Sequence, residues 1–179
     1  MRLWKCGALA ELAGTVRLHV AGQVAKEFQA QGPSERAALV GLGATTHGVR
    51  PGTPAWEQLC LLRAGRCSTR DLGEDESLAV ALTQIAQGEW LPFVTYDRQA
   101  TRITTDLGVV ALDFLDTLAW LVGCGVVTAE RGDEIEALAS MVDGWRRPAG
   151  YAGSIESVRG ARQAHLIERV AAWRAKPGS

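Results

Sequence analysis

The sequence lacks two features that would place it in a broad functional class at once. Its 179 residues carry 19 Lys and Arg against 20 Asp and Glu, so no overall positive charge points to nucleic-acid binding, although a local patch is still compatible with it. Its most apolar run, around Leu118 to Val127, contains two glycines and is shorter than the roughly 20 residues that cross a bilayer. The chain is therefore expected to be soluble and to have no membrane partner.

Metal-binding patterns of cysteine and histidine are also lacking. The four cysteines follow no zinc spacing and no secretory signal, namely Cys6, Cys60, Cys67 and Cys124. Thiols without either pattern are typical of reduced cytoplasmic proteins, so a cytoplasmic location is predicted. None of the scattered histidines stands at a zinc spacing from a cysteine. We expect His19 to face outwards from a strand, His47 to lie in an irregular loop and His165 to lie on the last helix.

What the sequence does contain is an alternation of helical and strand patterns. Apolar residues at helical spacing predict helices over 3–12, 22–30, 54–63, 72–87, 98–106, 113–123, 128–142 and 155–173. Alternating or continuous apolar runs predict strands over 15–20, 91–95 and 108–112, with one short strand within the loop 41–54. This succession favours an α/β protein with three layers, α/β/α, around a central parallel sheet.

The spacing also predicts which helix faces are buried. In the helix over 128–142, Ile135, Leu138 and Met141 are expected to point inwards. In the last helix the expected inward residues are Ile155, Val158, Leu166, Ile167 and Val170.

Carboxylates stand at the ends of several predicted elements between Asp71 and Asp116. Each has a structural and a functional interpretation. Asp71 and Glu74 have the spacing of a capping box, and Asp97 could cap the helix that begins at Arg98. Asp113 and Asp116 resemble a cap and a first-turn acid that the helix dipole favours. Because the carboxyl end of a parallel strand is where α/β proteins place their chemistry, Asp97 is also a candidate metal ligand.

Three stretches of the chain together resemble a known family. They are GEDESLAVALTQ, LPFVTYDRQATRITTDLGVVAL and DTLAWLVGCGVVTAERGDEI, within residues 72–138. They look like the second half of a PIN-like nuclease domain, and TVRLHVAGQVAKEF upstream matches more loosely. The resemblance implies a domain that binds Mg²⁺ or Mn²⁺ through acidic residues and cleaves RNA, often as the toxin of a toxin and antitoxin pair.

The resemblance also implies a site. Glu27 in VAKEF, Glu76 in GEDES and Asp97 in TYD match acidic positions of the family. They would be metal ligands, with Asp97 and Glu76 as the catalytic residues. Thr95 stands where the family often has a small hydroxyl residue.

The family's first strand, which ends in a further aspartate, has no counterpart in the sequence. Met1 to Lys5 already matches the helix that follows it. We expect one of three explanations, namely a segment upstream of Met1, a replacement by the C-terminal region or a partner chain, or a degenerate domain that binds without cutting.

On this basis residues 1–145 form the predicted PIN-like domain and residues 146–179 a helical extension. The extension is rich in arginine, and its cations are expected to be a solvated face, a surface for RNA phosphates or an acidic partner. Its amphipathic helix is also a candidate homodimer element. The expected function is a metal-dependent ribonuclease, and the alternative is a non-catalytic PIN-like module that binds RNA or a protein partner.

Overall fold

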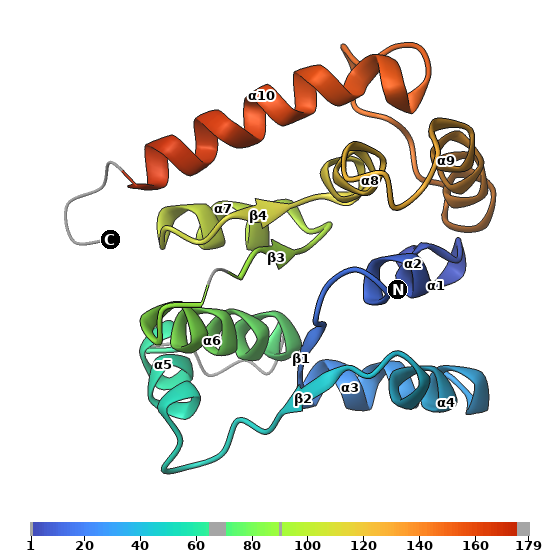
Figure 1. Ribbon diagram of the computed structural model, residues 1–179. Helices are drawn as coiled ribbons and strands as arrows, with labels where there is room; N and C mark the ends of the chain where they lie inside the picture. Colours follow the sequence, from blue (N-terminus) through green and yellow to red (C-terminus); the bar gives the residue numbers. More distant parts are fainter. Residues whose placement is uncertain (1, 65–70, 90, 175–179) are drawn as a thin grey trace. The chain divides into compact units, whose positions relative to one another are not determined.

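The computed structural model describes residues 2–64, 71–89 and 91–174. It divides into two units, and each is described separately. The central unit is Arg17–Phe93, and the terminal unit joins Met1–Val16 to Val94–Ser179. Both are mixtures of helices with short strands, drawn in Figure 1. The predicted α/β class is therefore confirmed.

The central unit is built on a two-stranded parallel sheet with four helices. Its elements are β1 (His19–Ala21), α3 (Gly22–Gln29), α4 (Pro33–Gly41), β2 (Thr45–His47), α5 (Pro54–Leu62) and α6 (Leu72–Ala86). In the sheet, His19 lies opposite Thr45 and Ala21 opposite His47. Helix α6 packs against α3, α5 and β1. Helix α5 begins as predicted, because the Thr53 hydroxyl accepts a hydrogen bond from the Trp56 N–H at 3.3 Å.

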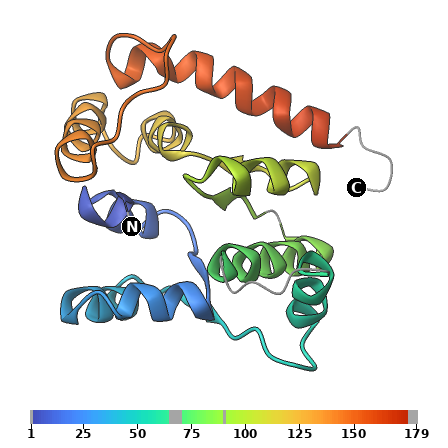
Figure 2. The same cartoon turned by 180° about the vertical axis from the view of Figure 1, so that it is seen from behind.

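The terminal unit is mostly helical. Its elements are α1 (Arg2–Lys5), α2 (Ala8–Ala13), α7 (Arg98–Asp106), β4 (Ala111–Leu112), α8 (Phe114–Gly123), α9 (Ala129–Asp143) and α10 (Ile155–Arg174). Strand β3 (Phe93–Val94) lies where the chain passes from one unit to the other, and it pairs with β4. Helix α10 packs along α8, as Figure 1 and the reverse view in Figure 2 both show.

The core of the terminal unit centres on α8. Eight of its ten residues are buried, and the largest fully buried ones are Phe114, Leu115, Leu118 and Leu121. Helix α9 approaches this core closely at Gly132, where a β-carbon would lie 2.7 Å from Ile155 Cγ2 and 3.0 Å from Val122 Cγ2. The absence of a side chain at Gly132 is what allows α9 to approach α8 and α10 here.

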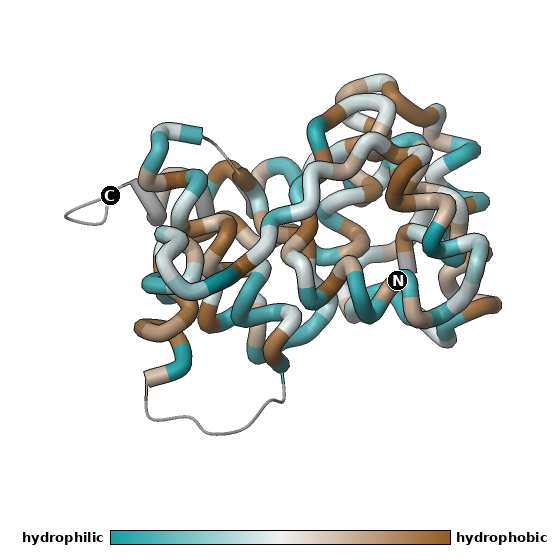
Figure 3. Tube along the Cα trace, turned by 90° about the horizontal axis from the view of Figure 1, so that it is seen from below, coloured by the Kyte–Doolittle hydropathy of each residue, from teal (hydrophilic) through white to brown (hydrophobic). Residues whose placement is uncertain are grey.

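Hydrophobic residues are distributed over many elements. In Figure 3, brown hydrophobic segments alternate with teal hydrophilic ones along the tube. Among the described residues, no helix combines the length and the apolar character needed to span a bilayer.

Several predicted elements differ from the structure in extent. The helix expected over 3–12 is interrupted at Gly7, whose φ of 79° is a left-handed conformation that ends α1. The expected strands are longer than β1, β3 and β4. Helix α4 was not predicted, although Pro33 occupies its first turn. The sequence also predicts a loop over 64–70, of which only position 64 lies within the described residues.

The predicted buried faces also need correction. Ile135 is fully buried, but Leu138 is 37% exposed and Met141 is 81% exposed. Helix α9 instead buries Gly132, Ile135, Glu136 and Ala139, the side on which Gly132 lies against Ile155 and Val122. In α10, Ile155 and Val158 are buried as expected, whereas Ile167 is 68% exposed.

Candidate functional site

Asp97 lies three residues beyond β3 and forms the N-terminal cap of α7. Its Oδ1 accepts a hydrogen bond from the Ala100 N–H at 2.8 Å, and its own N–H donates to the Thr95 hydroxyl at 3.2 Å. The carboxylate is exposed, and no described residue donates a hydrogen bond to Oδ2. The capping interpretation of Asp97 is therefore confirmed, and one carboxylate oxygen is free for a second role.

Glu76 lies in the second turn of α6 and points towards the beginning of α3. Its Oε2 accepts a hydrogen bond from the Gln23 N–H at 2.9 Å. That N–H belongs to the first turn of α3, where backbone donors have no partner within their own helix. Glu76 therefore satisfies a helix terminus that the helix dipole makes favourable for negative charge.

Glu27 lies one turn further along α3 and approaches the same region of α6. Its Oε1 accepts a hydrogen bond from Gln23 Nε2 at 2.9 Å. A β-carbon at Gly73, in the first turn of α6, would lie 3.3 and 3.4 Å from the two Glu27 carboxylate oxygens. The structure thus brings Glu27 and Glu76 together around Gln23, whereas Asp97 belongs to the terminal unit.

Asp75, the neighbour of Glu76, has a different role. It is buried, and its Oδ2 forms an ion pair with Arg63 Nη1 at 2.5 Å. Successive helical residues point about 100° apart, so Asp75 faces α5 while Glu76 faces α3. Among the described residues, no Lys or Arg forms an ion pair with Glu27 or Glu76.

The expected capping box at Asp71 and Glu74 is wrong. Asp71 has a φ of 62°, in the left-handed region, and its side chain makes no capping hydrogen bond to α6. A capping residue needs an extended backbone to direct its side chain at the helix N–H groups. The box occurs instead at Asp113 and Asp116, where Asp113 Oδ1 accepts from the Asp116 N–H at 2.7 Å.

These two aspartates also hold Arg162 of α10. Arg162 Nη2 lies 2.7 Å from Asp113 Oδ2 and 2.5 Å from Asp116 Oδ1, and its Nη1 lies 3.5 Å from the Tyr151 hydroxyl. Burial favours a lower pKa for Arg162, but Tyr151 and the two carboxylates outweigh it and raise the pKa. Arg162, which we expected on a solvated or phosphate-binding face, is therefore a buried structural cation.

A histidine pair joins the two strands of the central unit. His19 Nδ1 and His47 Nε2 lie 2.8 Å apart, and the rings stack with their centroids 5.0 Å apart. Burial and the charge of His19 lower the pKa of His47 below its ordinary value of 6.5, against the opposing charge of Glu89. The sequence places His19 on a strand and His47 in a loop, and their proximity depends on the pairing of β1 with β2.

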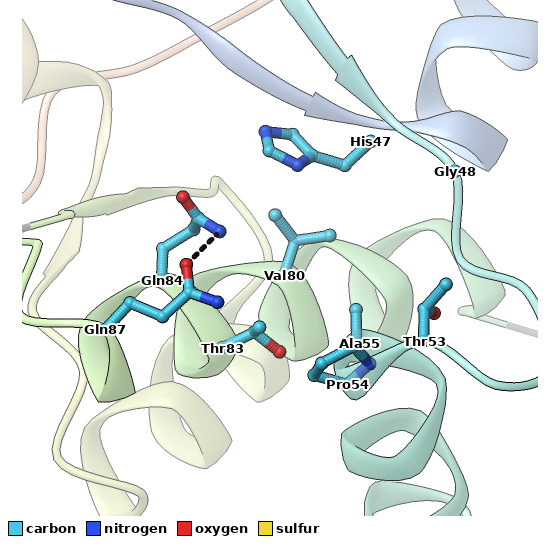
Figure 4. A pocket seen from close by; sticks show the side chains of 9 residues that line it. All are labelled: His47, Gly48, Thr53, Pro54, Ala55, Val80, Thr83, Gln84 and Gln87. Atoms are coloured by element: carbon cyan, nitrogen blue, oxygen red, sulfur yellow. Dashed lines mark hydrogen bonds between the residues drawn. The ribbon is translucent and has the colours of Figure 1, made fainter.

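The His47 ring also borders a cavity of about 200 Å³ in the central unit. Figure 4 shows the His47 ring above Val80 and Gln84 of α6. Pro54 and Ala55 of α5 lie below Val80 in the same view. Sequence reasoning missed this cavity because its residues come from three separate elements.

Carboxylate oxygens are the ligands that Mg²⁺ and Mn²⁺ prefer, so Glu27, Glu76 and the free oxygen of Asp97 have the right chemistry for such an ion. Within residues 2–64, 71–89 and 91–174, no three His, Cys, Asp or Glu side chains gather closely enough to hold a metal ion. Comparison with models of protein families, with curated proteins and with solved structures finds nothing that matches this chain.

Proposed function

We propose that the chain is a PIN-like ribonuclease that depends on Mg²⁺ or Mn²⁺. Glu27, Glu76 and Asp97 are the proposed metal ligands, and Glu76 and Asp97 are the proposed catalytic residues. The observation that supports this most is the approach of Glu27 and Glu76 around Gln23, with no ion pair to either from any residue that the structure describes. Close carboxylates repel one another unless a cation compensates them, and a divalent ion would do so.

The proposal includes the finer architecture of the family. Residues 1–145 would form a three-layer α/β/α domain around one central parallel sheet, with 146–179 as its helical extension. The bound RNA, an antitoxin protein and a second copy of the chain are its proposed partners, and the cytoplasm its location. The sequence motifs around Glu27, Glu76 and Asp97 support these proposals.

The proposed mechanism assigns a role to each carboxylate. A divalent ion, when bound, polarises the phosphoryl group and lowers the pKa of a water molecule. Asp97, held by its capping bond to Ala100, would present Oδ2 from a fixed backbone position. Glu76 is oriented by the Gln23 N–H, so its Oε1 would remain available to a ligand. Gln23 Nε2 fixes Glu27 in the same way.

Cleavage of a mixed RNA pool tests this function. The purified chain is incubated with Mn²⁺ or with EDTA, in parallel with Asp97→Asn and the control Asp106→Asn. Asp106 is an exposed carboxylate at the end of the same helix. We expect cleavage only with Mn²⁺, its loss in Asp97→Asn and its retention in Asp106→Asn. Cleavage by Asp97→Asn at the wild-type rate would refute the assignment.

A second function is favoured by one observation. Arg162 binds both Asp113 and Asp116, so a protein cation already compensates these two carboxylates. This ion pair agrees with a PIN-like module that binds RNA or a protein partner and does not cut RNA. Metal-independent RNA or partner binding, with no cleavage at any Mn²⁺ concentration, would select this function over the nuclease.

A further inference from the structure

The cavity beside His47 is not used by the proposed metal site. It measures about 200 Å³ and is lined from β2, from the start of α5 and from the second half of α6. This volume is below the roughly 300 Å³ at which pockets for drug-sized ligands begin. The cavity therefore fits a small planar group rather than an extended molecule.

Two glutamines on α6 provide the polar edge of the cavity. Gln84 Nε2 donates a hydrogen bond to Gln87 Oε1 at 3.2 Å, as the dashed line in Figure 4 marks. This bond leaves Gln84 Oε1 as an acceptor and Gln87 Nε2 as a donor, and neither has a partner among the residues described. The pair thus offers one acceptor and one donor, at its two ends, to a ligand.

The other residues that line the cavity would suit a ligand with a flat, weakly polar face. Val80, Pro54 and Ala55 provide apolar contact, and the His47 ring lies across the cavity from Val80 (Figure 4). The Thr83 hydroxyl, which also lines the cavity, already donates to the Ala79 carbonyl at 2.8 Å. Orientation of a ligand would therefore depend mainly on the two glutamines.

We propose that this cavity binds one nucleobase of an RNA strand, an inference that rests on the ribonuclease function proposed above. Proteins recognise single-stranded RNA by placing bases against aromatic or histidine rings and by hydrogen bonds to base edges. The base lies between the His47 ring and Val80, and its edge meets Gln84 and Gln87. Adenine is the base tested, because its edge carries both a donor and an acceptor.

Adenosine 5′-monophosphate and ribose 5-phosphate, titrated into the full chain in EDTA, test this site by NMR. The two probes share sugar and phosphate and differ only in the base. We expect the monophosphate to shift the signals of Gln84 and Gln87, and ribose 5-phosphate to leave them unchanged. Equal binding of both probes, or binding of neither, would overturn the proposal.

Two variants test whether Gln84 and Gln87 are responsible for binding the monophosphate. The double variant Gln84→Ala, Gln87→Ala is expected to weaken binding of the monophosphate about tenfold. Gln31→Ala, an exposed glutamine of the same unit outside the cavity, is the matched control and should bind like wild type. Unchanged affinity in the double variant would overturn the proposed site.

EDTA separates this test from that of the nuclease. Binding of the monophosphate through Gln84 and Gln87, with no Mn²⁺-dependent RNA cleavage, would support the base site and refute the nuclease function. RNA cleavage that needs Asp97, together with monophosphate binding that the double glutamine variant does not change, would support the nuclease function and refute the base site.

Discussion

At the scale of single residues, carboxylates at the ends of elements take different roles, as helix caps, as partners of an arginine or as proposed ligands. The caps at Asp97 and Asp113 follow from local sequence, because the acceptor and its N–H donors are three residues apart. Asp71 has the same local pattern, but its left-handed backbone directs the side chain elsewhere. Ion pairs such as Arg162 with Asp116 join residues far apart in the sequence, so spacing does not predict them.

Two substitutions separate the capping role of Asp97 from its proposed metal role. Asp97→Ala should lower the free energy of unfolding by about 0.5–2 kcal/mol, because the Ala100 N–H loses its acceptor. Asn caps helices as well as Asp does, so Asp97→Asn should keep the stability. Urea unfolding monitored by circular dichroism measures both. A loss in Asp97→Asn as large as that in Asp97→Ala would contradict a simple capping role.

Arg162→Met should be strongly destabilising, by about 3–5 kcal/mol, because it leaves a carboxylate buried without its cation. Asp116 is only 4% exposed, so water cannot replace Arg162. Arg159→Met is the control, since the ion pair that Arg159 forms with Glu156 of the same helix is partly exposed, and such pairs contribute about 0–1 kcal/mol. Equal stability of the two variants in urea unfolding would show that the buried ion pair is not structural.

At the scale of elements, helices follow from the sequence more closely than strands do. Helix α7 was predicted with the observed bounds, because its cap and apolar positions are local. The strands are only two or three residues long, and their ends depend on pairing partners elsewhere in the chain. The inward face of α9 differs from the predicted one, and on its buried side Glu136 pairs with Arg147, a residue outside the helix.

Two glycines on helices test the close packing of α9. Gly132→Ala should destabilise the chain by about 1–3 kcal/mol, since the new β-carbon would overlap Ile155 Cγ2. Gly160→Ala in α10 has open space around the position, so its better helix propensity should stabilise the chain by roughly 0.5–1 kcal/mol. Thermal unfolding should show shifts of opposite sign. A stabilising Gly132→Ala would mean that α9 does not approach α8 and α10 so closely.

The histidine pair makes the stability of the central unit depend on pH. His47 has a lowered pKa when folded, so the unfolded chain binds more protons as the pH falls through about 6.5. The contribution of His47 is therefore fully present above that pH and is lost below it, between the unfolded and the folded pKa. His47→Gln should flatten the fall in unfolding free energy between pH 7 and 5, whereas His165→Gln, an exposed control, should not. An identical pH profile for wild type and His47→Gln would contradict this.

At the scale of the whole molecule, the proposed function needs carboxylates from both parts of the chain. Glu27 and Glu76 belong to the central unit and Asp97 to the terminal unit. The sequence motifs predicted the three residues, and the contact between α3 and α6 that joins Glu27 to Glu76 is seen only in the structure. We propose that these carboxylates bind the divalent ion that cleavage requires.

Isothermal titration calorimetry with Mn²⁺ tests that claim most directly. Wild type, Glu76→Gln, Asp97→Asn and the control Glu57→Gln, an exposed acid of α5, are titrated without RNA. We expect wild type and Glu57→Gln to bind Mn²⁺ with the same affinity, and Glu76→Gln and Asp97→Asn each to lose about tenfold or more of that affinity. Equal Mn²⁺ affinity in all four proteins would contradict this expectation.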